Sequence, residues 1–165
     1  MTKDTVPQNF TMGLVLFDAV PVILFGMASW LLWKMTGVPF VLAGGAVCFV
    51  SGMLKVLWKG IVVARKKNVW PLFMQMQIGM PIGFAVLIAG FVIACVTEDM
   101  SMFWEGLCRP LPVVFIVIFI LGMAAMIVCG SKLNSEDLRA NWIEQSCNSI
   151  AQGAFFLAML FVYLK

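Results

Sequence analysis

The stretch LPVVFIVIFILGMAAMIVCGS, at residues 111–131, decides the fold class because none of its 21 side chains carries a charge. A helix needs about 20 apolar residues to cross the roughly 30 Å hydrocarbon core of a bilayer, at 1.5 Å per residue. The stretch therefore has the length and composition of a transmembrane helix. Four more apolar stretches are found in the chain, at about residues 11–34, 39–64, 71–96 and 142–164, and the last of them belongs to a helix predicted over 135–164.

The composition of the whole chain agrees with this interpretation. Of its 165 residues, 62% are hydrophobic and 12% are charged, and the mean hydropathy is +1.02. Soluble domains are about 45–50% apolar and about 25% charged. The sequence therefore predicts an all-α integral membrane protein, a single domain built as a bundle of five transmembrane helices. Nucleic acid is excluded as a partner because no basic stripe alternates with aromatic residues.

Prolines mark where several of these helices are expected to begin. In the first turn of a helix, proline is tolerated because the N–H that it lacks would have no partner there. The prolines placed in this way are Pro39, Pro71, Pro110 and Pro112. The last helix is predicted to begin at Ser135, whose hydroxyl suits an N-cap and is followed by two acidic residues that favour a first turn.

The distribution of basic residues predicts the orientation in the membrane. The connection after the second stretch carries Arg65, Lys66 and Lys67. The connection after the third carries Glu98, Asp99 and Glu105 against a single arginine. Lysine and arginine favour the cytoplasmic side. We therefore expect a multi-pass protein of the cell (inner) membrane, with its N-terminus in the cytoplasm and its C-terminus outside. The first stretch shows no small-residue cleavage pattern, so we expect it to be retained as a helix.

Several chemistries are disfavoured by the residues present. The chain has no histidine, which removes imidazole ligands for zinc or haem and imidazole acid–base groups. Its five cysteines are scattered and form no CxxC pair. The sequence therefore predicts no catalytic residue, no metal site and no cofactor.

Ionisable residues lie inside two of the predicted spans. Asp18 and Lys55 are each expected roughly 10–13 Å below the cytoplasmic end of their helices, counted at 1.5 Å per residue. A charge at this depth indicates either a functional site or a buried pair. We expect Asp18 to pair with Lys55, and Lys59 to lie one turn further along the same face. The alternatives are that the pair only maintains the fold and that Lys59 extends to the headgroups.

The last predicted helix carries a stripe of polar side chains. These project within about 100° at 3.6 residues per turn, and the same face continues outward as Phe155 and Met159. Polar groups avoid lipid, so the stripe should turn toward the bundle or toward a partner helix. Together with Gln75 of the third helix, the candidate ligand-binding residues are Asp18, Lys55, Lys59, Gln75, Glu144, Gln145, Asn148 and Gln152.

The leading hypothesis is a small membrane transporter, or a membrane-embedded solute-binding subunit, with a polar cavity open to the cytoplasmic side. Its partners would be the lipid bilayer and a polar or charged small solute. Because five helices make a small protomer, we also expect a homodimer or an association with other membrane subunits. The spacing of Gly79 and Gly83 predicts close packing of the third helix against another helix of the same chain.

Two alternatives stay open on the sequence alone. The chain could be an accessory or sensory subunit that binds a partner through the polar stripe of its last helix. It could also be a lipid-modifying membrane enzyme that uses Asp18, Glu144 and Lys55 as acid–base groups. The absence of a serine or cysteine nucleophile with an adjacent base makes enzyme activity the weaker of these interpretations.

Overall fold

The computed structural model describes residues 10–132 and 138–164, and every regular element in these ranges is a helix. Five helices are long and apolar enough to cross a membrane, which confirms the predicted multi-pass architecture. A short sixth helix, α4, was not predicted. The predicted N-cap Ser135 lies outside the described residues. The elements are α1 (Met12–Thr36), α2 (Pro39–Arg65), α3 (Trp70–Thr97), α4 (Ser101–Leu107), α5 (Pro110–Lys132) and α6 (Leu138–Tyr163).

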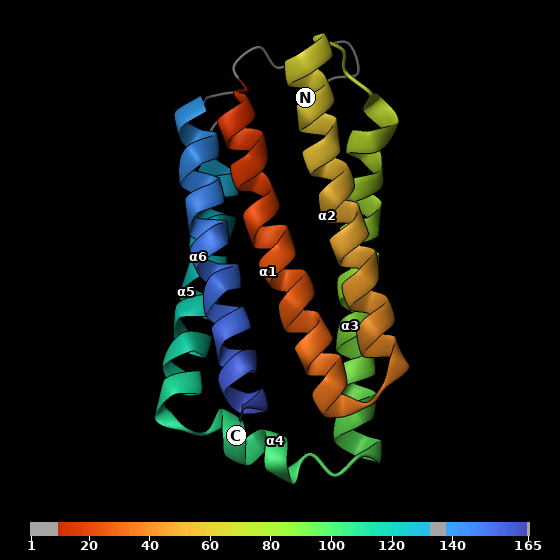
Figure 1. The fold of residues 1–165 in the computed structure, drawn as a ribbon, viewed down its shortest axis with the longest axis vertical. Coiled ribbons are helices and arrows are strands. Elements are labelled where there is room, and N and C mark those ends of the chain that lie inside the picture. Colours follow the sequence, from red (N-terminus) through yellow and green to blue (C-terminus); the bar gives the residue numbers. More distant parts are fainter. Residues whose placement is uncertain (1–9, 133–137, 165) are drawn as a thin grey trace.

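The long helices run up and down the bundle (Figure 1). α1 packs against both α2 and α6, α3 packs on α2, and α5 packs on α6, so the order across the bundle is α3–α2–α1–α6–α5. The two termini of the described chain lie at opposite ends. We call the end that holds Arg65, Lys66 and Lys67 the basic end, and the opposite end, where α4 lies, the far end.

The helix boundaries follow local signals that the sequence contains. The Thr11 hydroxyl accepts a hydrogen bond from the Leu14 N–H at 3.3 Å and caps α1. Gly37 ends α1 in the left-handed conformation, at φ 70°, and its N–H donates to the Trp33 carbonyl. Pro39 and Pro110 are the first residues of α2 and α5, as the sequence predicted.

Glycines bring α2 and α3 into close backbone contact. A methyl group built on Gly44 of α2 would lie 2.7 Å from the Gly83 carbonyl oxygen of α3. One built on Gly90 of α3 would lie 2.6 Å from the Val41 backbone nitrogen of α2. Gly79 of α3 faces the side chain of Ser51 of α2. The predicted close packing within the chain is confirmed, and the Gly79–Gly83 spacing is part of a longer glycine contact.

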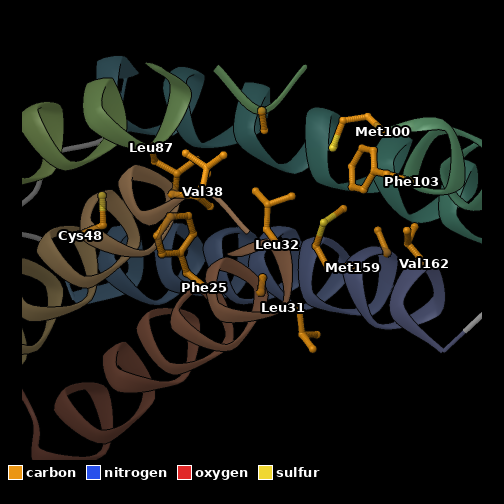
Figure 2. Packing of buried hydrophobic residues seen from close by; sticks show 14 residues of the cluster. Phe25, Leu31, Leu32, Val38, Cys48, Leu87, Met100, Phe103, Met159 and Val162 are labelled. Carbon is orange, nitrogen blue, oxygen red and sulfur yellow. The ribbon is translucent and has the colours of Figure 1, made fainter. Parts of the chain in front are cut away.

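The far half of the bundle has an apolar interior. Figure 2 shows this cluster, in which Phe25 and Leu32 of α1 lie with Leu87 of α3 and Met159 of α6. Phe103 of α4 joins it and closes the far end. The interior at this depth is mainly hydrocarbon and aromatic rings, and the buried hydroxyls of Ser29 and Thr36 donate to carbonyls of their own helix.

α4 is a short helix of seven residues, and a local polar contact precedes its first turn. The Asp99 carboxylate accepts a hydrogen bond from the Ser101 N–H at 3.0 Å, which lowers the pKa of Asp99. Gly106 allows α4 to pack closely on Val162 of α6. Because Asp99 is fully exposed, this contact positions the helix and contributes little to its stability.

Candidate functional site

The centre of the site is an ion pair between Asp18 of α1 and Lys59 of α2. The Lys59 Nζ lies 2.9 Å from the Asp18 Oδ2, and the two side chains are only 4% and 3% exposed. The predicted pairing of Asp18 with Lys55 is therefore wrong, and Lys59 does not extend to the surface. A charge buried this deeply is stable only with a partner.

The direction of side chains on antiparallel helices explains the choice of partner. Val15 faces Gly60 and Val22 faces Gly52, so the Cα of Asp18 lies at a height between Lys55 and Lys59. Side chains on a helix lean toward its N-terminus. Asp18 therefore leans toward the basic end and Lys59 leans away from it, and the two meet. Lys55 leans toward the far end, out of reach.

Aromatic side chains cover the pair at the basic end. The Lys59 ammonium lies 5.2 Å from the centre of the Phe10 ring, a cation–π contact, and Phe10 packs edge-on against Trp58. The Trp58 indole N–H donates to the Asn68 side-chain oxygen at 3.0 Å. Lys55 and Glu144 both act on the charge of Lys59, the first by repulsion and the second by attraction. Residues of α1, α2 and α6 thus share one electrostatic cluster.

The polar stripe of α6 turns into its own bundle. Asn141 is buried, as are Gln145 and Gln152, which are 1% and 7% exposed. Trp142 contacts Phe17 of α1 on one side of the stripe, and Ala151 meets Gly122 of α5 on the other. The stripe therefore faces the interior between α1 and α5. A partner helix would need the opposite orientation.

Three buried oxygens on α6 have no hydrogen-bond donor within the part of the chain that the structure describes. They are the Oε1 atoms of Gln145 and Gln152 and the Oγ of Ser149. The Gln152 amide nitrogen, in contrast, donates to the Asn148 oxygen at 3.4 Å and to the Met123 sulfur at 3.6 Å. Buried polar atoms are normally paired, so these oxygens are the candidate acceptors of the site. The sequence analysis missed Ser149, although it lies one turn beyond Gln145.

Gln75 and Lys55 have different surroundings from the other candidates. The Gln75 amide nitrogen donates to the Ser51 carbonyl of α2 at 3.1 Å and to the Leu72 carbonyl of its own helix at 3.3 Å, so it ties α3 to α2. Lys55 is half-buried and has no ion-pair partner within residues 10–132 and 138–164. Ligand binding by either residue stays a prediction.

A row of four phenylalanine rings separates the polar cluster from the far half of the bundle. Phe84 of α3 contacts Phe25 of α1 at 5.3 Å between ring centroids, and Phe25 stacks on Phe155 of α6 at 6.2 Å. Phe155 in turn stacks on Phe119 of α5 at 4.9 Å. Phe155 lies three residues beyond Gln152, where the polar stripe stops. The row crosses four helices, and polar solutes would meet it as a barrier.

The cavities of about 400, 330 and 280 Å³ found in the structure are lined by residues outside the polar cluster. The first lies between α1 and α2 on the lipid side, beside Gly26 and Phe49. The third lies under α4, beside Phe103 and Met159. The polar cavity open to the cytoplasm stays a prediction.

No group of three or more histidine, cysteine, aspartate or glutamate side chains suited to a metal ion occurs in the described part of the chain. Comparison with protein-family models, with curated proteins and with solved structures found no match. The fold and site define a small polytopic membrane protein with an internal polar cluster, and its function has to be inferred from that cluster.

Two glutamine exchanges test these hydrogen-bond assignments. Gln145→Leu is expected to leave the free energy of unfolding unchanged or to raise it by up to about 1 kcal/mol, because it removes an acceptor without a donor. Gln75→Leu is expected to lower it by about 0.6 kcal/mol, since it breaks an interhelical hydrogen bond. Unfolding by denaturing detergent measures both. A larger loss for Gln145→Leu than for Gln75→Leu would contradict the assignment.

Proposed function

We propose that this chain is a small membrane transporter, or the membrane-embedded solute-binding part of one, and that its solute site is the polar cluster around Asp18 and Lys59. One observation carries the proposal: the buried ion pair of α1 and α2 and the buried amides of α6 lie on the same side of a row of phenylalanine rings, toward the basic end. Burying polar groups in a membrane is unfavourable, and a polar solute gives a reason for it.

The arrangement suits access from the basic end. The polar residues lie between that end and the phenylalanine row, so a solute from the basic side reaches them first. Pro21 lies inside α1, three residues from Asp18, and has no N–H to donate to the Phe17 carbonyl. A helix is weakest where such a bond is missing. Bending of α1 at this point would separate Asp18 from Lys59 and open the cluster.

The accessory-subunit alternative receives less support. A stripe that binds a partner helix has to lie on the outer surface, whereas the α6 stripe is buried between α1 and α5. The outer surfaces of α3 and α5 are formed by large apolar side chains, among them Ile88, Val96, Leu121 and Ile127, which suit lipid. Self-association through these surfaces stays a proposal.

A solute screen on the purified protein in lipid nanodiscs tests the proposed function. A ligand that binds only the folded protein raises its apparent stability with the logarithm of ligand concentration over Kd, once that ratio is well above one. We expect at least one class of polar metabolite to raise the unfolding temperature and to be taken up by proteoliposomes that contain the protein. A panel of polar metabolites with no stabilising member, and no uptake of any, would contradict the proposal.

The proposed orientation predicts which cysteines react from outside the cell. Cys108 lies in the exposed connection between α4 and α5 at the far end, so we place it outside. In a variant with Cys108 as its only cysteine, a membrane-impermeant maleimide should label intact cells. The matched control carries Lys66→Cys at the basic end in a cysteine-free background and should react only after permeabilisation. The reverse pattern would place the basic end outside.

A further inference from the structure

We propose that the solute is a small zwitterion with a protonated primary amine and a carboxylate, held by the α6 oxygens and by Lys55. This inference rests on the proposed function, because it names the class of solute for the same site. The evidence is the balance of donors, acceptors and charges within the cluster.

Buried oxygens without a hydrogen-bond donor lie together on α6. The Gln145 and Gln152 side chains are more than nine-tenths buried, and their oxygens, like the Ser149 hydroxyl oxygen, have no donor in the described part of the chain. The Gln152 and Gln75 amide nitrogens cannot serve these oxygens, since they donate to other protein atoms. A ligand that completes the site therefore has to bring N–H or O–H groups. A protonated amine brings three and forms the stronger, charge-assisted hydrogen bonds.

The charges of the cluster favour a ligand with no net charge. Asp18 and Lys59 neutralise each other at 2.9 Å. Lys55, one turn from Lys59 on α2, and Glu144, next to Gln145 on α6, contribute one positive and one negative charge. A ligand with a net charge would leave that charge uncompensated in a low-dielectric interior, which is strongly unfavourable. A zwitterion carries one positive and one negative charge and therefore adds no net charge.

Lys55 supplies the place for the carboxylate. It is half-buried within α2 and has no ion-pair partner among the described residues, although a lysine in a span is normally paired or extends to the surface. It lies one turn from Lys59, on the side away from the basic end. An amine on the Gln145 and Gln152 oxygens and a carboxylate on Lys55 would bridge α6 and α2.

Four matched compounds separate the roles of the two groups. They are 4-aminobutyrate, butylamine, butyrate and 4-(trimethylammonio)butyrate. The last carries the same charges as 4-aminobutyrate but has no N–H donor. The measurement is the unfolding temperature of the protein in nanodiscs, at fixed ionic strength, as a function of compound concentration. We expect 4-aminobutyrate to bind at least about tenfold more tightly than each of the other three, because each lacks one charge-assisted interaction.

Variants connect this preference to the residues. Gln145→Leu with Gln152→Leu should reduce the preference for 4-aminobutyrate over its trimethyl analogue to less than about twofold. Lys55→Met should do the same for 4-aminobutyrate against butylamine. The matched control is Gln77→Leu, since Gln77 is exposed on α3 and should leave both preferences unchanged. If the double variant does not fold, either single glutamine exchange serves with a smaller expected loss.

Several results would overturn the inference. Equal binding of 4-aminobutyrate and its trimethyl analogue would show that the α6 oxygens receive no donor. Equal binding of 4-aminobutyrate and butylamine would show that Lys55 does not bind the carboxylate. Stabilisation by sodium chloride alone, with no added effect of any amine, would show that the α6 oxygens bind an alkali ion instead. If another polar metabolite binds in wild type but not in a folded Asp18 variant while no amine does, the proposed function stands and this inference fails. If nothing binds, both fail.

Discussion

Asp18→Asn is expected to lower the free energy of unfolding by about 3–5 kcal/mol, because it leaves the Lys59 ammonium buried without its counter-charge. The ion pair spans 2.9 Å and its side chains are almost completely buried, so water cannot replace the lost carboxylate. The phenyl ring of Phe10 still faces the ammonium, but a cation–π contact is worth only about 1–2 kcal/mol. Reversible unfolding in detergent–lipid mixtures measures the loss.

The double variant Asp18→Leu with Lys59→Met provides the control for this effect. Replacing both charges by apolar groups of similar volume is often neutral or stabilising, so the double variant should recover most of the lost stability. Glu98→Gln is the surface control, since Glu98 is exposed after α3, and it should change the free energy of unfolding by less than about 0.5 kcal/mol. A single variant as stable as the wild type would show that the charges are not buried together.

Gly44→Leu is expected to prevent α2 and α3 from packing and to lower the free energy of unfolding by about 3 kcal/mol or more. The first carbon added at Gly44 would already lie 2.7 Å from both the Gly83 carbonyl oxygen and the Leu87 Cα, and backbone atoms cannot move aside as a flexible side chain can. Gly44→Ala should show the same effect at about 1–3 kcal/mol. The unfolding assay used for Asp18→Asn applies here as well.

Gly13→Ala is the matched control for the glycine contact. Gly13 lies in the exposed first turn of α1, and the nearest atom to an added methyl group is the Thr11 hydroxyl oxygen at 4.0 Å. Alanine there should leave stability unchanged or raise it by about 0.5–1 kcal/mol, because glycine loses more conformational freedom in a helix. Equal effects of alanine at Gly13 and Gly44 would contradict the close α2–α3 contact.

The membrane architecture could be predicted because it depends on local properties of the chain. Apolar runs of more than about 20 residues fix the number of spanning helices, and prolines such as Pro39 and Pro110 fix where they begin. The inward direction of the α6 stripe follows from the penalty for polar groups in lipid. α4 escaped prediction because a helix of seven residues has too few turns to show a periodic pattern.

The details of the site depend on how helices meet, which the sequence does not state. Asp18 pairs with Lys59 and not with the predicted Lys55. Side chains on antiparallel helices lean in opposite directions, and this shifts the contact by about one turn. The phenylalanine row combines residues from four helices, so no spacing along one helix reveals it. Gln75 shared a face with the glycines of α3 for a structural reason, since its amide ties α3 to α2.

The central claim is that the polar cluster binds a solute and does not merely maintain the fold. Uptake into proteoliposomes by the folded double variant Asp18→Leu with Lys59→Met tests it most directly, using the solute that stabilises the wild type most. The proposal predicts that the double variant unfolds at a temperature close to that of the wild type and takes up no solute. Uptake at the wild-type rate by that variant would show that the ion pair has no part in transport.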